Sequence, residues 1–127
     1  MKRFFTLIFT ALIAASFSLS PQSGIDDVIS AVKAGNASQV AQYFDNTVEI
    51  ALPAKTNSYS KSQGEMVLKD FFASNPVKSF QVMHKGDKAG SQFCIGTLTT
   101  KTGAYRTTIF MKQKADKQVL QEIRFEN

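Results

Sequence analysis

Pro76 divides the sequence into two parts with different hydrophobic periods. Before it, apolar residues recur three and four positions apart, as they do on one face of a helix. After it, they alternate with polar residues, which is the pattern of a half-buried strand. Short turns separate the alternating segments, so we predict an antiparallel meander. Its four strands are expected over residues 77–85, 91–100, 105–114 and 118–126.

Two helices are predicted near the start of the first part. The first has one apolar stripe, formed by Ile25, Val28, Ile29 and Val32. It ends at AGN (34–36), because Gly35 suits the left-handed conformation that closes many helices. A second, short helix follows with Asn36 or Ser38 as its N-cap. A strand over 48–52 comes next, and Pro53 ends it.

A third helix is predicted between Ser60 and Asn75. Ser60 and Gln63 have the spacing of a capping box, and Asn75-Pro76 ends the helix because proline disfavours a helical residue before it. Helices followed by strands indicate an α+β fold. We expect about three N-terminal helices on one face of a curved antiparallel sheet; the resemblance described below implies that this sheet is cone-shaped.

Residues 1–20 have the organisation of a secretory signal peptide. Lys2 and Arg3 precede the apolar run FFTLIFTALIAA, and ASFSLS supplies small residues for cleavage between positions 16 and 20. Residues 21–127 are then long enough for a single domain. We expect an exported protein, periplasmic or secreted, from a Gram-negative bacterium.

Composition excludes several classes of function. Without Lys2 and Arg3 the formal charge falls from +5 to +3, too low for a dedicated nucleic-acid binder. No second apolar stretch could span a membrane in the mature chain. One cysteine, Cys94, and one histidine, His84, give no metal-ligand spacing, and no phosphate or dinucleotide motif is present. We therefore expect no metal and no cofactor, and we expect Cys94 to be a buried structural residue.

Four segments carry a resemblance to known proteins: KAGNASQVAQYFDNTVEIAL, YSKSQGEMVLKDFFASNPVKSFQVMHKG, IGTLTT and LQEIRFE. From Ile25 to Asn127 the chain is similar to the nuclear-transport-factor-2-like superfamily, also described as a cystatin-like cone. Within it, the chain resembles a family of small secreted bacterial domains of unknown function. The resemblance implies a sheet that curls around a helix, with an interior that is either solid core or an apolar pocket. The superfamily includes isomerases, dehydratases, ligand carriers and dimerisation domains, so fold alone does not determine function.

A ligand pocket inside the cone would be built from aromatic residues and the first turn of the third helix. Tyr59 and Gly64 would lie at its mouth, where a glycine on the buried side leaves room or permits close backbone approach. We predict the following ligand-binding residues: Tyr59, Gly64, Phe71, Phe80, His84 and Phe93.

His84 is the candidate for catalysis, since it is in phase with Phe80 and Val82 and is expected to face inward. No carboxylate is in register with it, which argues against an assembled acid–base set. The alternative interpretation is that His84 is a half-exposed packing residue.

Five lysines are expected on one rim of the sheet: Lys85, Lys88, Lys112, Lys114 and Lys117. They would either steer an anionic ligand or solubilise the hairpin tips.

Three hypotheses for function follow. The first is a non-catalytic domain that binds a small apolar or amphipathic ligand or a protein partner. The second is an isomerase- or dehydratase-type enzyme that uses His84, with Tyr59 as a helper. The third is a structural module that forms a homodimer through its sheet. The aromatic helix facing a curved sheet, without an acid–base set, favours the first.

Overall fold

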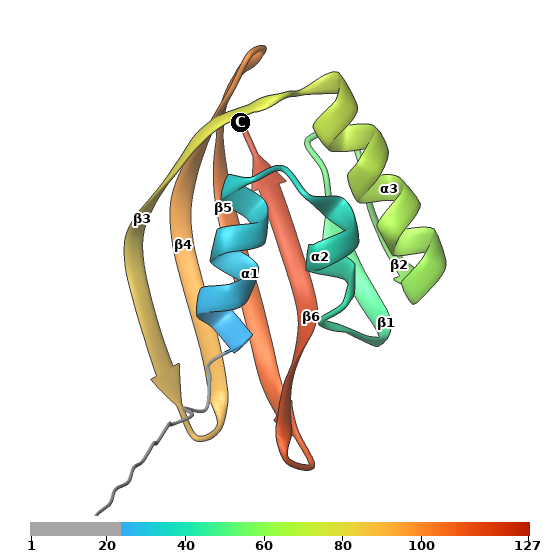
Figure 1. Cartoon of the computed structure of the whole chain (residues 1–127), viewed down its shortest axis with the longest axis vertical. Helices are drawn as coiled ribbons and strands as arrows, with labels where there is room; N and C mark the ends of the chain where they lie inside the picture. The colour runs from blue at the N-terminus through green and yellow to red at the C-terminus, as the bar shows by residue number, and fades with distance from the viewer. Residues whose placement is uncertain (1–23) are drawn as a thin grey trace, which may run out of the picture.

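The computed structural model describes residues 24–127, so the predicted signal peptide lies outside the described residues. Helices and strands follow one another as in Figure 1. Their bounds are α1 (Gly24–Lys33), α2 (Ala37–Ala41), β1 (Phe44–Ala51), β2 (Thr56–Ser60), α3 (Lys61–Ser74), β3 (Val77–Lys88), β4 (Ser91–Thr100), β5 (Gly103–Lys114) and β6 (Lys117–Glu126). The predicted α+β class, with three helices before the meander, is confirmed.

All six strands form one sheet in the order β2-β1-β6-β5-β4-β3. The meander β3 to β6 is antiparallel throughout, as predicted from its short turns. One pairing departs from the expected antiparallel sheet, because β1 pairs with β6 in parallel. Local turns determine the antiparallel pairs, whereas β1 and β6 are brought together from opposite ends of the domain.

The first strand begins at Phe44, four residues earlier than predicted. Phe44 is opposite Leu120 of β6, and the register shifts before the next paired residue, Glu49. This irregularity interrupts the alternation of apolar and polar residues, which is why the sequence pattern shows a strand only from Val48 onward.

Side chains cap α2 and α3 as their sequences predict. Asn36 accepts a hydrogen bond from the backbone N–H of Gln39 at the start of α2. Ser60 and Gln63 form a reciprocal capping box at the start of α3, with bonds of 3.3 and 3.4 Å. Asn75 ends α3, and its side-chain amide donates a hydrogen bond of 2.9 Å to the backbone oxygen of Phe71. These bonds satisfy backbone groups that a helix end leaves unpaired.

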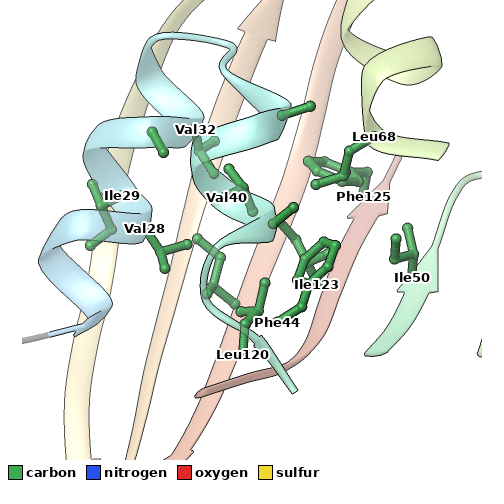
Figure 2. Close-up of a cluster of buried hydrophobic side chains, with 14 of the residues drawn as sticks. Val28, Ile29, Val32, Val40, Phe44, Ile50, Leu68, Leu120, Ile123 and Phe125 are labelled. Atoms are coloured by element: carbon green, nitrogen blue, oxygen red, sulfur yellow. The ribbon is translucent and has the colours of Figure 1, made fainter. Parts of the chain in front are cut away.

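The core lies between the helices and one face of the sheet, which we call the inner face. Figure 2 shows side chains from both helical and strand elements pointing into the same space. Phe125 and Leu120 from β6 meet Leu68 of α3, Val40 of α2 and Val28 of α1, and each of these five side chains is buried. Burial of this one continuous cluster holds the helices on the sheet.

Candidate functional site

The interior of the cone is filled by aromatic side chains. Phe71 stacks on Phe125 with ring centroids 4.4 Å apart, and Phe72 meets the same ring edge-on. Phe80 is 4% exposed and covers Gly96, where an added β-carbon would lie 2.8 Å from the Phe80 ring. Phe71 and Phe80 therefore belong to the packed core and do not line an interior pocket.

A β-bulge moves His84 away from the position predicted for it. Val82 is opposite Gly96, yet His84 is opposite Ile95, so Met83 is an extra residue in β3. One extra residue reverses which face the following side chains occupy. His84 consequently lies on the opposite face from Phe80 and is exposed. The expectation of an inward histidine is wrong, because the sequence period alone does not reveal the bulge.

Phe93 also lies on the face away from the helices. Its neighbours in β4 at positions 94, 96 and 98 are buried on the inner face, so alternation directs Phe93 outward. The Phe93 ring covers Gly86 of β3, where an added β-carbon would lie 2.9 Å from the ring. The centroid of the same ring is 5.4 Å from that of His84. Phe80 and Phe93 are thus separated by the thickness of the sheet.

The first turn of α3 packs closely against β1. A β-carbon at Gly64 would be 2.9 Å from both the Phe44 ring and a methyl group of Val48. Gly64 therefore serves close packing and leaves no opening. Tyr59 is half-buried on β2, opposite Val48. The structure brings Tyr59 and Gly64 to the same region of β1 but does not join them with Phe71, Phe80, His84 and Phe93 in one site.

The second face of the sheet, which we call the outer face, is covered by no helix within residues 24–127. Its centre is apolar, since Phe93 and Phe110 are opposite each other and Ile95 is opposite Thr108. These four side chains are half-buried. The outer face also carries Thr97, Arg106, Glu122, Arg124 and Glu126 in register with this centre.

Charges on the outer face are unevenly distributed between its two margins. At the β6–β1 margin Arg124 contacts three carboxylates, of Glu122 at 2.7 Å, Glu126 at 3.4 Å and Glu49 at 3.9 Å. The hydrogen bond to Glu122 raises the pKa of Arg124. Three carboxylates around one guanidinium leave this margin acidic. The β3 margin carries His84 and Lys88 instead.

The first residue of α1 and the β5–β6 hairpin contribute to a cleft of about 420 Å³. Figure 1 shows α1 beginning at the end of the domain where the β3–β4 and β5–β6 turns lie. We call this cleft the end cleft. Its lining comes from α1 (Gly24, Asp27), the α2–β1 connection with the first residue of β1 (Gln42, Tyr43, Phe44), α3 (Lys61) and the β5–β6 hairpin (Gln113, Asp116, Lys117, Gln118, Val119). Four separate segments build it, so no contiguous sequence motif marks it.

Polar contacts organise the region of the end cleft. The hydroxyl of Tyr43 donates to the Asp27 carboxylate at 3.1 Å, and partial burial together with this bond raises the pKa of Tyr43. Next to it, Lys114 donates to Asp45 at 2.8 Å. That bond, with help from a backbone N–H, lowers the pKa of Asp45 to about 2. Both contacts tie the hairpin and α1 to the start of β1.

Two of the five rim lysines are engaged in ion pairs. Lys85 lies 2.7 Å from Asp26 of α1, and this hydrogen bond raises the pKa of Lys85. Lys114 is paired with Asp45. These two lysines hold neighbouring elements together, so the rim is not a uniform cationic surface for an anionic ligand.

Cys94 is buried on the inner face, as predicted, and desolvation raises the pKa of its thiol. A thiol in this state is a poor nucleophile. Within residues 24–127, no cluster of three or more histidine, cysteine, aspartate or glutamate side chains could hold a metal ion. The described helices include none that is long and apolar enough to cross a membrane.

Comparison with known proteins supports this architecture. Residues 25–126 match the family model described as Domain of unknown function (DUF4783). A DUF4783 family protein from Bacteroides fragilis is 33% identical with a TM-score of 0.75, over 80% of this chain and 95% of that one. One from Bacteroides uniformis is 31% identical with a TM-score of 0.77, over 80% and 94%.

A more distant structure indicates the wider fold class. An NTF2-like protein of unknown function from Cytophaga hutchinsonii has a TM-score of 0.59 at 7% identity, over 80% of this chain and 84% of that one. At this identity the similarity concerns the fold alone. No curated protein matches the sequence. The fold is NTF2-like, and the family model matches nearly all of the described residues. This chain therefore belongs to the DUF4783 family.

Proposed function

We propose that this domain is a non-catalytic binding module whose binding surface is the outer face of the sheet, and that the surface binds a second copy of the chain. The observation that carries the proposal is the apolar centre of that face, with Phe93, Ile95 and Phe110 left uncovered by any described helix. Clustered aromatic and aliphatic side chains on a sheet are typical of interaction surfaces.

The pattern of the outer face is self-complementary. A two-fold axis parallel to the strands, between β4 and β5, would exchange these two central strands between the copies. Phe93 of each copy would then meet Phe110 of the other, because the two residues are in register across the axis. Two sheets packed in this way lie about 10 Å apart with interdigitated side chains.

The same axis brings together margins of unlike charge. Lys88 and His84 lie on the β3 margin, whereas Glu49 and Glu122 lie on the β6–β1 margin. The axis places each copy's β3 over the other's β6, so His84 is level with Arg124 and the Lys88 end of β3 approaches the carboxylates around it, and the contact occurs twice. Charge complementarity of this kind favours one register of association over others.

The geometry does not favour the enzyme hypothesis. His84 is the only histidine of the chain, and it lies on the outer face instead of the interior. The geometry also narrows the hypothesis of a domain that binds a small ligand or a protein partner. Phe71, Phe80 and Phe125 fill the interior, so a bound molecule would have to lie outside the core.

Sedimentation velocity and light scattering of the mature chain test the proposal. We expect a dimer at micromolar concentration, and we expect Ile95→Glu to give a folded monomer by circular dichroism. Met66→Glu is the matched control, because Met66 is 66% exposed on α3, away from the sheet. If Ile95→Glu does not fold, Thr97→Arg makes the same test from a half-buried threonine.

A wild-type monomer at high micromolar concentration would overturn the proposal. A dimer that survives both Ile95→Glu and Thr97→Arg would also overturn it, because the interface would then lie elsewhere.

We also propose that residues 1–20 direct export. Their basic start, apolar run and small-residue end support this. Expression in a Gram-negative host, followed by fractionation and N-terminal sequencing, should yield a periplasmic chain that begins between residues 17 and 21. A cytoplasmic chain that retains Lys2 and Arg3 would contradict it.

A further inference from the structure

We propose that the end cleft binds a neutral, polyhydroxylated small molecule, the size of one or two sugar rings. This site is independent of the outer face, because its lining comes from α1, the α2–β1 connection with the first residue of β1, α3 and the β5–β6 hairpin. Its volume of about 420 Å³ falls within the range of small-molecule sites.

The cleft has a solid base. Phe44 is 2% exposed and Val119 is 6% exposed, and both contribute to the lining. Gly24 lies against the side chain of Gln118, so that a β-carbon at Gly24 would be 2.8 Å from the Gln118 β-carbon. Phe44 and Val119 thus give the cleft a partly apolar base, and a glycine at position 24 keeps this base uncrowded.

The walls offer paired donors and acceptors. Gln42, Gln113 and Gln118 supply three amides, and each amide has two N–H donors and a carbonyl acceptor. The Tyr43 hydroxyl and the Asp27 carboxylate, 3.1 Å apart, supply another pair. A hydroxyl group both donates and accepts a hydrogen bond, so a ligand with neighbouring hydroxyls matches groups of this kind.

One acceptor in the wall has no partner among residues 24–127. The Nε2 of Gln118 donates to the backbone oxygen of Gly90 at 3.2 Å, while its buried Oε1 accepts no hydrogen bond from any group in residues 24–127. A buried acceptor without a donor is unfavourable, because it has lost its hydrogen bond to water and gained none in return. When the Gln118 amide rotates toward the cleft, Oε1 can accept from a ligand hydroxyl and Nε2 exchanges its bond to Gly90 for one to a neighbouring hydroxyl. The Gly90 oxygen keeps the hydrogen bond from the backbone N–H of Gln113.

The charges at the cleft select against ionic ligands. Asp27 and Asp116 balance Lys61 and Lys117, so the lining has no net charge. A strongly anionic or cationic ligand would meet as much repulsion as attraction. A purely apolar ligand would strip water from the amides without replacing their hydrogen bonds, which is unfavourable. A neutral ligand rich in hydroxyl groups avoids both penalties.

Nuclear magnetic resonance titration of the ¹⁵N-labelled mature chain tests the proposal. The neutral probes are cellobiose and N,N′-diacetylchitobiose, and the comparators are citrate, spermidine and the dipolar glycylglycine. We expect saturable shifts from at least one neutral probe, confined to the amides of Tyr43, Lys117 and the glutamine side chains of the cleft. Citrate, spermidine and glycylglycine should leave these signals in place.

Single variants then locate the site. Gln113→Ala and Tyr43→Phe should each weaken binding by roughly three- to tenfold, as the loss of one hydrogen bond predicts. Gln81→Ala is the matched control, since Gln81 is an exposed glutamine of β3 outside the cleft, and it should leave binding unchanged.

Several outcomes would overturn the proposal: no saturable shift with either disaccharide at tens of millimolar, shifts with the charged or dipolar comparators alone, or equal effects of Gln113→Ala and Gln81→Ala. Because the end cleft shares none of its lining with the apolar centre of the outer face, failure of the disaccharides leaves the sedimentation test of that face unaffected.

Discussion

Gly64 of α3 lies so close to Phe44 of β1 that a β-carbon at Gly64 would be 2.9 Å from the Phe44 ring. Real β-carbons almost never come this near to another heavy atom, and Val48 restricts the same space at 2.9 Å. The glycine lets α3 approach the sheet, although glycine within a helix is about 1 kcal/mol less favourable than alanine.

Gly64→Ala is therefore expected to destabilise the domain despite the better helix propensity of alanine. Overpacking of a filled core costs about 1–3 kcal/mol and alanine recovers about 1 kcal/mol of helix propensity, so we expect a net loss of about 1 kcal/mol in the free energy of unfolding. Urea denaturation measures it. Ser62→Ala, at an exposed position of the same helix, is the control and should change stability little. A more stable Gly64→Ala variant would show that the helix can shift outward freely.

The bulge in β3 predicts unequal effects for two residues that the sequence places on one face. Phe80→Ala should lose about 3–4 kcal/mol, because a buried aromatic ring is removed. His84→Ala should change the free energy of unfolding by no more than about 0.5 kcal/mol, since His84 is exposed. Chemical denaturation of both variants measures the difference. A large loss for His84→Ala would place this side chain in the core after all.

The β3–β4 turn and the β5–β6 turn each have an alanine in the left-handed region of φ. Ala89 has φ of 52° and Ala115 has φ of 59°. In this region an L-residue is roughly 1–2 kcal/mol less favourable than glycine. Glycine loses more conformational entropy on folding than alanine does, which offsets about 0.5–1 kcal/mol of this difference. We expect Ala115→Gly to stabilise the domain by about 0.5–1 kcal/mol, visible as a higher Tm. Ala104→Gly, at an exposed strand position, should do the opposite. A lower Tm for Ala115→Gly would contradict the strain.

Asp45 should make stability depend on pH at the acidic end. Its pKa is about 2 in the folded chain, below its ordinary value of 3.8, because Lys114 and a backbone N–H stabilise the carboxylate. A lowered folded pKa means that the contribution to stability is fully present above pH 3.8 and is lost as the pH falls through 2. Since Lys114 is 56% exposed, solvent screening limits the contribution to about 1 kcal/mol.

Asp45→Asn should therefore destabilise the domain by about 1 kcal/mol at pH 7 and should differ little from the wild type near pH 2. Urea denaturation at a series of pH values measures this. Asp87→Asn, at an exposed aspartate of β3, is the control. A loss for Asp45→Asn that is equal at both pH values would mean that its ion pair with Lys114 contributes nothing.

Most of the secondary structure could be predicted from local signals. The capping box of Ser60 and Gln63 marked the start of α3, and alternation after Pro76 marked four strands to within a few residues. These features depend on side chains reaching their own backbone, or on the two-residue period of a strand. Both signals come from residues that are close together in the sequence.

The candidate sites could not be predicted in the same way. The extra residue at Met83 turned His84 to the outer face, and no residue type nearby signals a bulge. The end cleft joins Asp27, Tyr43 and Gln118, which are far apart in the chain. Such a cleft exists only once the hairpin β5–β6 has met α1.

The sequence by itself determined the order of helices and strands, the antiparallel meander and an aromatic-rich core, because short-range geometry and hydrophobic period specify them. Only the tertiary structure decided that β1 runs parallel to β6, that Phe80 and Phe93 lie on opposite faces, and that the cone is filled. The physical reason is that register and packing are settled between segments distant in the chain, where one added residue reverses a face.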